Sequence, residues 1–114
     1  MHELSLCQSI VEILKERAGS HDYRTVSRVE LRIGPRAMVE PDAMAFCFAV
    51  ASRGTLAEGA ALEIRFIPAR VVCLDCLGQG EVEKLASACP RCGSYRLLME
   101  EEDSGLRLGE IEVE

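Results

Sequence analysis

Four cysteines in the second half of the chain form two pairs with the same spacing. The pairs are Cys73-Leu74-Asp75-Cys76 and Cys89-Pro90-Arg91-Cys92, with twelve residues between them. Two intervening residues let a tight turn aim both sulfur atoms of a pair at one point, so two such turns can supply four thiolates at tetrahedral corners. Pro90 sets φ in the second turn, and Gly93 allows a positive φ just after it. The spacing therefore predicts one structural zinc ion held by Cys73, Cys76, Cys89 and Cys92.

The segment around these cysteines gives a second reason to expect zinc. Residues 70–104 contain few large apolar side chains and many glycines and charges. About 35 residues of this composition cannot bury a sufficient core alone. Zinc contributes roughly 10–16 kcal/mol to the folding of comparable peptides. We expect a closed structural site with no coordination position left for catalysis.

The chain begins with Met1-His2-Glu3, which offers a different kind of metal site. An α-amino group has a pKa of roughly 7.7–8.0 and can ligate a metal near neutral pH. The His2 backbone nitrogen and imidazole add two nitrogen donors in fused chelate rings, and planar nitrogen ligation selects Ni(II) or Cu(II) over Zn(II). Glu3, or a ligand from elsewhere, is left for the fourth position. Judged by the residues alone, an ordinary surface histidine is the default interpretation of His2. His21, expected in a loop, is not expected to be a ligand.

Hydrophobic periodicity predicts two helices and three strands. Apolar residues at three- and four-residue spacing indicate a helix over Leu4–Ala18 that Gly19 ends, and a second helix starts at Pro41 and closes at Arg53-Gly54. Strict alternation of apolar and polar residues indicates strands over 28–33, 62–66 and 110–114. Cys7 and Cys47 belong to the apolar faces of the two helices, so we expect them to be small buried hydrophobic residues.

The last strand decides the expected architecture, because it needs a sheet to join. The two earlier strands offer one, which makes the zinc segment an insertion between the second and third strands. We expect an α+β fold with a three-stranded sheet, two helices on one face and an inserted four-cysteine zinc ribbon. The expected domains are 1–69 with 105–114 and 70–104. The charge run Glu100–Asp103 is expected to be a solvated face, and Ser104-Gly105 a hinge.

Composition excludes several classes of function. The 114 residues carry a net charge of −6, which makes nucleic acid or an anionic membrane a poor default partner. No apolar run reaches the 18 or more residues that a membrane span needs. The sequence shows no signal-peptide pattern, which favours a reducing cytoplasm. No catalytic motif or nucleophile–base set is evident among the two histidines and their neighbours, so we do not expect an enzyme.

Several stretches together are similar to one known family. They are the opening Met1–Cys7, the strand ending Ile33-Gly34, the Ala45–Phe48 run, Gly54 with Ala57-Glu58-Gly59, and the paired cysteines ending Cys89–Cys92. In this order and over essentially the whole chain, they resemble a HypA/HybF-type nickel metallochaperone of hydrogenase maturation.

This resemblance implies nickel binding to which Met1, His2 and Glu3 contribute, and a separate zinc domain. It also implies a cytoplasmic accessory protein that works with a hydrogenase-maturation GTPase to insert nickel into the large subunit of [NiFe]-hydrogenase. Because some members of the family also serve urease, urease maturation proteins stay open as further partners.

Two other functions are compatible with paired cysteines. A zinc ribbon that binds nucleic acid needs a basic surface, but residues 70–104 carry four basic side chains against seven acidic ones, and one aromatic. A thiol-disulfide enzyme needs a free thiol of low pKa, whereas zinc-bound thiolates are occupied. Two disulfides or two redox dithiols fit less well, because no secretory segment precedes the cysteines and two matched pairs suit one metal better than two separate redox centres.

Overall fold

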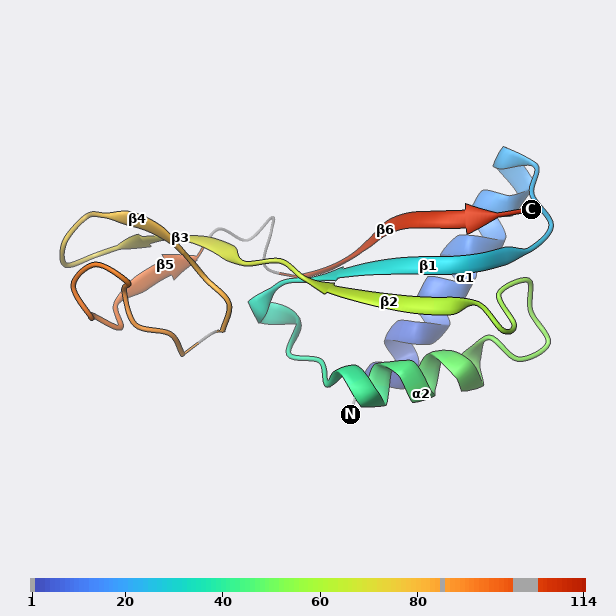
Figure 1. Cartoon of the computed structure of the whole chain (residues 1–114), viewed down its shortest axis with the longest axis horizontal. Coiled ribbons are helices and arrows are strands. Elements are labelled where there is room, and N and C mark those ends of the chain that lie inside the picture. The colour runs from blue at the N-terminus through green and yellow to red at the C-terminus, as the bar shows by residue number, and fades with distance from the viewer. Residues whose placement is uncertain (1, 85, 100–104) are drawn as a thin grey trace. The chain divides into compact units, whose positions relative to one another are not determined.

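The computed structural model describes residues 2–84, 86–99 and 105–114. In chain order, the helices and strands are α1 (Glu3–His21), β1 (Val26–Ile33), the short 3-10 helix η1 (Pro35–Ala37), α2 (Pro41–Ala51), β2 (Ala61–Phe66), β3 (Ala69–Cys73), β4 (Gln79–Val82), β5 (Leu97–Met99) and β6 (Leu106–Val113). They form two sheets of three strands, β2-β1-β6 and β4-β3-β5, which can be followed in Figure 1.

The chain divides into two compact units. The first comprises Met1–Leu31, Val39–Ile64 and Leu108–Glu114, and the second comprises Arg32–Met38 and Arg65–Arg107. The domain boundaries 1–69 with 105–114 and 70–104 stay a prediction. The predicted solvated run Glu100–Asp103 lies outside the described residues, as does Ser104 of the predicted hinge.

α1 forms because its apolar residues recur on one face. Cys7, Ile10, Val11 and Leu14 are buried on that face. The prediction that Gly19 ends this helix is wrong. α1 continues to His21, and Asp22 adopts the left-handed conformation with φ 57° and donates its N–H to Ala18 O at 3.1 Å. Asp tolerates the left-handed conformation, so the helix ends there. Gly19 then lies inside the helix, which lowers helix stability only modestly.

α2 begins and ends close to the predicted positions. Pro41 occupies the first turn, where its missing N–H costs nothing. Glu40 precedes it as the N-cap, and its Oε2 accepts from Ala43 N at 2.8 Å. Met44 and Phe48 are buried, and Ser52 ends the helix. The prediction for the helix cysteines holds for Cys7, which is fully buried, and in part for Cys47, which is half-buried.

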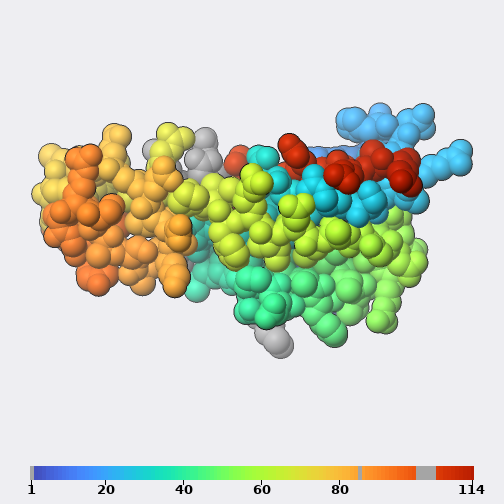
Figure 2. Space-filling model, in the orientation of Figure 1, coloured from blue at the N-terminus to red at the C-terminus, as the bar shows by residue number. Residues whose placement is uncertain are grey.

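The central strand β1 separates an apolar face of the first sheet from a charged one. Val29, Leu31 and Ile33 alternate along β1 and are all buried. Arg28 points to the other face and forms ion pairs with Glu63 of β2 and with Glu110 and Glu112 of β6. Figure 2 shows β6, β1 and β2 side by side at the surface in this order. The charged side chains occupy one face of this sheet, and α1 and α2 cover the other, apolar face (Figure 1). This arrangement confirms the predicted α+β fold class.

The second sheet was not predicted from the sequence. β3 pairs antiparallel with β4 (Ala69↔Val82 to Val72↔Gln79) and with β5 (Val71↔Met99 to Cys73↔Leu97). The flanking strands are short, and Gly80 and Glu81 interrupt any apolar alternation in β4.

Neither helix in the described part of the chain is long and apolar enough to cross a membrane.

The fully buried Leu14 provides a test of the core. Its backbone oxygen also accepts a hydrogen bond from Tyr23 Oη at 2.8 Å, which ties the end of α1 to the following loop. Leu14→Ala removes methyl groups and leaves a cavity, so it should destabilise the protein by about 2–5 kcal/mol. Ile13→Ala is the matched control, because Ile13 is 38% exposed on the same helix. Urea unfolding followed by helix circular dichroism checks this, and equal losses for both variants would contradict it.

Candidate metal centres

The two cysteine pairs occupy turns with the same hydrogen bonds. In the first turn, Cys73 N donates to Gly78 O at 2.9 Å and Leu77 N donates to Cys73 O at 2.9 Å. In the second, Cys89 N donates to Ser94 O at 2.6 Å and Gly93 N donates to Cys89 O at 2.9 Å. The residue directly after the second cysteine of each pair has a positive φ, which is 59° at Leu77 and 80° at Gly93. The positive φ predicted for Gly93 is confirmed, and the first turn achieves the same geometry with leucine.

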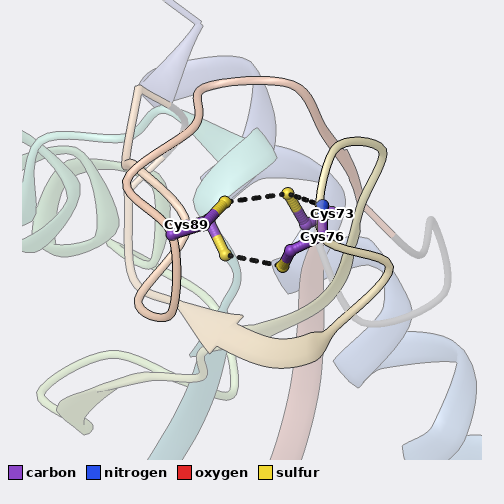
Figure 3. A group of neighbouring side chains, drawn as sticks. Cys73, Cys76 and Cys89 are labelled. Atoms are coloured by element: carbon purple, nitrogen blue, oxygen red, sulfur yellow. Dashed lines mark hydrogen bonds between the residues drawn. The ribbon is translucent and has the colours of Figure 1, made fainter.

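The two turns bring four sulfur atoms together, as Figure 3 shows for three labelled cysteines. Cys73 Sγ lies 3.6 Å from Cys92 Sγ, and Cys76 Sγ lies 3.8 Å from Cys89 Sγ. All four atoms lie within 4.8 Å of one another. Four sulfurs about 2.3 Å from a common centre at tetrahedral corners are about 3.8 Å apart. A disulfide needs about 2.05 Å, so these distances match a shared metal and not two disulfides.

Backbone N–H groups point at the sulfurs and favour their ionised form. Cys76 N lies 3.5 Å from Cys73 Sγ, and Arg91 N lies 3.4 Å from Cys89 Sγ. The N–H of Cys76 lowers the pKa of Cys73, and the N–H groups of Cys92 and Arg91 lower the pKa of Cys89 to about 6. For Cys92, the N–H of Ser94 acts the same way, but the neighbouring Cys73 thiol, desolvation and the other two thiols outweigh it and raise the pKa to about 12. Four thiolates this close together require a cation.

The donor set fits zinc by its chemistry. Four soft sulfur ligands at tetrahedral separations form a closed site, the arrangement typical of structural zinc. Cys73 and Cys89 are buried, whereas Cys76 and Cys92 are exposed. Among the described residues, these four are the only group of three or more His, Cys, Asp or Glu side chains close enough to share a metal ion.

Three polar residues that the spacing argument missed connect the two turns. The Asp75 carboxylate accepts from the Ser94 hydroxyl and from Arg96 Nη1, the latter at 2.8 Å. Leu74 N also donates to Arg96 O at 2.8 Å. The only feature of the sequence that could have pointed to this link was an acidic residue, Asp75, between the two cysteines of the first pair. These bonds hold the turns in register, so they help to position the four sulfurs.

The N-terminal residues are held at the start of α1. His2 is exposed and is the N-cap of α1, with Leu6 N donating to its backbone oxygen at 3.0 Å. Glu3 Oε2 accepts from Glu40 N at 3.4 Å. The N–H of Glu3 itself, the N–H of Glu40 and the charge of His2 lower the pKa of the Glu3 carboxyl. The structure thus brings His2, Glu3 and the unpredicted Glu40 together, while Met1 lies outside the described residues.

His21, the other histidine, lies away from any group of possible ligands among the described residues. The expectation of a loop is wrong, because His21 is the last residue of α1. Its Nδ1 lies 3.1 Å from both Arg17 O and Ser20 Oγ. A basic side chain in the last turn suits the negative end of the helix dipole, which gives His21 a role in the helix terminus.

An α+β body joined to a sheet that carries four converging thiols defines a small metal-binding protein. The chain matches the family described as "Hydrogenase/urease nickel incorporation, metallochaperone, hypA" over residues 1–113. It therefore belongs to the HypA family of nickel-incorporation metallochaperones. A metallochaperone carries a metal and catalyses no reaction, in agreement with the expectation that this protein is not an enzyme.

Individual relatives agree with this assignment. The chain is 46% identical to the hydrogenase maturation factor HypA of Azotobacter chroococcum mcd 1 and 45% identical to the hydrogenase maturation factor HybF of Morganella morganii, each over 114 residues and 100% of both chains. The solution structure of the Ni metallochaperone HypA from Helicobacter pylori has the same fold, with a TM-score of 0.69, 23% identity, and coverage of 99% of this chain and 97% of that one.

Gly93 provides a test of the second cysteine turn. Its φ of 80° disfavours any side chain, although no atom lies within 4 Å of where a Cβ would sit. Gly93→Ala should cost roughly 1–2 kcal/mol of turn stability, which lowers the metal affinity of the four thiols by about 5- to 30-fold. Gly105→Ala is the control, because Gly105 has equal space and no such φ. Zinc competition with a chromophoric chelator measures both, and similar affinities for the two variants would contradict the argument.

Proposed function

We propose that this protein binds Ni(II) at its N-terminus and delivers it during maturation of [NiFe]-hydrogenase. The observation that carries the proposal is the match of residues 1–113, which include Met1-His2-Glu3, to a nickel-incorporation family. The donors are the Met1 amine, the His2 backbone nitrogen and the His2 imidazole. The amide N–H of an N-cap residue has no intrahelical partner, so metal binding to the His2 nitrogen breaks no helical hydrogen bond.

The remaining position on nickel is assigned to the Glu3 carboxylate or backbone. The depressed pKa of Glu3 keeps its carboxylate ionised and ready to bind a cation. Glu40 lies beside it through the hydrogen bond from Glu40 N to Glu3 Oε2. Three nitrogen donors with one exchangeable oxygen donor select Ni(II) or Cu(II) over Zn(II) and leave a position through which the metal can move to an acceptor.

We further propose that Cys73, Cys76, Cys89 and Cys92 hold a structural zinc ion. The support is the tetrahedral spacing of their sulfurs and the N–H groups that favour thiolates. Zinc supplies the cation that lets the four thiols ionise together, and it cross-links the two turns of a segment with little core of its own. All four donors come from the chain, so the site is closed.

The proposed partners are a hydrogenase-maturation GTPase and the large subunit of [NiFe]-hydrogenase, with urease maturation proteins as further candidates. The support is that relatives similar over their whole length are named hydrogenase maturation factors and that the family description includes urease. We propose the cytoplasm as the location. The net charge of −6 argues against partners that are nucleic acids or anionic membranes.

The N-terminal nickel site predicts a specific effect of lengthening the chain. One glycine added before Met1 turns the α-amine into a peptide nitrogen, so the fused rings through His2 can no longer form. An amine–amide–amide–imidazole set becomes possible instead and fills all four corners of the plane, so nickel transfer should slow even where affinity is retained. Tag-free wild-type and extended proteins are compared by the rate of Ni(II) transfer to a chelator and by hydrogenase activity restored in a strain lacking this protein.

His2→Ala completes that comparison, because it removes the imidazole and leaves the chain length unchanged. It should lose specific Ni(II) binding while zinc content stays at one per chain. Full delivery by the extended protein, or normal Ni(II) affinity in His2→Ala, would mean that another group holds the transferred metal.

The zinc site predicts that a single ligand replacement releases the ion. Cys76→Ser should abolish stoichiometric zinc and unfold residues 70–104, because metal binding and folding are one process there. The helix signal should persist, because the helices pack in a core of their own. Cys47→Ser is the matched control, since it removes a thiol outside the cluster. Metal analysis with circular dichroism checks this, and full zinc occupancy in Cys76→Ser would refute the four-cysteine assignment.

A further inference from the structure

Cys7 and Cys47 are the two cysteines outside the four-cysteine cluster, and they lie on helices that pack against each other. Cys7 Sγ lies 3.6 Å from Met44 O and donates a hydrogen bond to it. A side chain three residues after a helical carbonyl lies close to that carbonyl, which is why short polar side chains bond back to it. Cys47 follows Met44 by three residues, so it lies one turn further along the helix that Cys7 contacts.

A second contact joins the first turns of the two helices. Glu40 N donates to Glu3 Oε2, and both this contact and the one between Cys7 and Met44 join residues 37 positions apart. The two contacts place the first turns of α1 and α2 close together. Cys47 is therefore one turn beyond the contact at Met44, on the face of α2 that carries Met44 and Phe48. Besides burial, a charge on the Cys47 sulfur raises the pKa of the Cys7 thiol, in agreement with two thiols that lie near each other.

The two thiols differ in access to solvent. Cys7 is fully buried, and burial raises the pKa of its thiol to about 11. Cys47 is half-buried and can meet a small reagent from solution. A buried thiol next to an accessible one is the arrangement of a resolving cysteine beside a reacting cysteine. Neither thiol has a part in the proposed nickel and zinc sites, so this pair is not explained by them.

We propose that Cys7 and Cys47 form a redox-active thiol pair that a peroxide converts to a disulfide between α1 and α2. The Cys47 thiolate attacks one peroxide oxygen and breaks the O–O bond, giving a sulfenic acid and one water. The Cys7 sulfur then attacks the Cys47 sulfur, and the displaced hydroxide leaves as a second water with the Cys7 proton. Two thiols are oxidised, one peroxide is reduced, and a dithiol reductant reverses the step.

The test is chemical mapping of the zinc-loaded, full-length protein after treatment with one equivalent of hydrogen peroxide. Free thiols are alkylated under denaturing conditions and the chain is cleaved with trypsin. Cys7 then lies in the peptide of residues 1–15 and Cys47 in that of residues 37–53, while the cluster cysteines fall in other peptides. We expect one linked species, lighter by two hydrogens than the sum of the two peptides, that disappears on reduction.

Two variants make the outcome decisive. Cys47→Ser should give no linked peptide and should leave Cys7 reduced, because a buried thiol does not meet the oxidant. Cys7→Ser should leave Cys47 as a sulfenic acid that dimedone traps. Cys47→Ser still decides the matter if Cys7→Ser does not fold. Recovery of both wild-type peptides unlinked, or linkage of Cys47 to a cluster cysteine or to a second chain, overturns the proposal.

The position of the pair implies an effect on nickel, and this consequence rests on the proposed function. Glu3 is one helical turn before Cys7, and Glu40 caps α2. A disulfide between the helices restricts their relative motion, so the oxidised protein should transfer Ni(II) to a chelator several-fold more slowly than the reduced one. An unchanged rate overturns this coupling. A reduced protein that binds no Ni(II) overturns the N-terminal site, while the linked peptide still tests the thiol pair.

Discussion

Crowding of four thiols into one small volume is the constraint on which the second unit depends. Sulfurs 3.6 and 3.8 Å apart cannot all carry a negative charge without a cation. The surrounding sheet buries few large side chains: Val71 and Val82 are its only buried branched aliphatics among the described residues. Order in this segment therefore comes from the turns that carry the sulfurs and from whatever cation joins them.

Backbone hydrogen bonds do most of the positioning in those turns. In each turn, the backbone N–H and C=O of the first cysteine both form hydrogen bonds within the turn. The Asp75 carboxylate connects the first turn to Ser94 and Arg96 of the second. Space is also restricted, because a Cβ on Gly78 would lie 2.8 Å from Arg91 Cδ and 3.2 Å from Cys76 Sγ. These contacts restrict the positions of the four sulfurs, and they act together with the cation that joins the sulfurs in ordering the segment.

The first unit holds its N-terminal residues by a different means. α1 starts directly at Glu3, so His2 is fixed by the helix that it caps, and that helix is fixed in turn by Cys7, Leu14 and the other buried residues of its inner face. Packing of α1 on α2 then brings Glu40 to Glu3. A flexible terminus would not fix these side chains, whereas the packed helix gives Glu3 a defined neighbour in Glu40.

Sequence by itself determined what depends on local spacing. The two C-x2-C pairs, the alternation of β1 and the start of α2 at Pro41 each follow from short-range geometry, and each is present in the structure. Tertiary structure alone decided what depends on residues far apart: the second sheet, the link from Asp75 to Arg96, the approach of Glu40 to Glu3 and the meeting of Cys7 with α2. The end of α1 also belongs to this group, since the helix runs past Gly19 to a cap at Asp22, directly before the buried Tyr23 whose hydroxyl donates to Leu14 O. The physical reason is that spacing along a chain fixes which side chains share a turn or a face, whereas contacts between distant segments are fixed only when the apolar faces of those segments pack together.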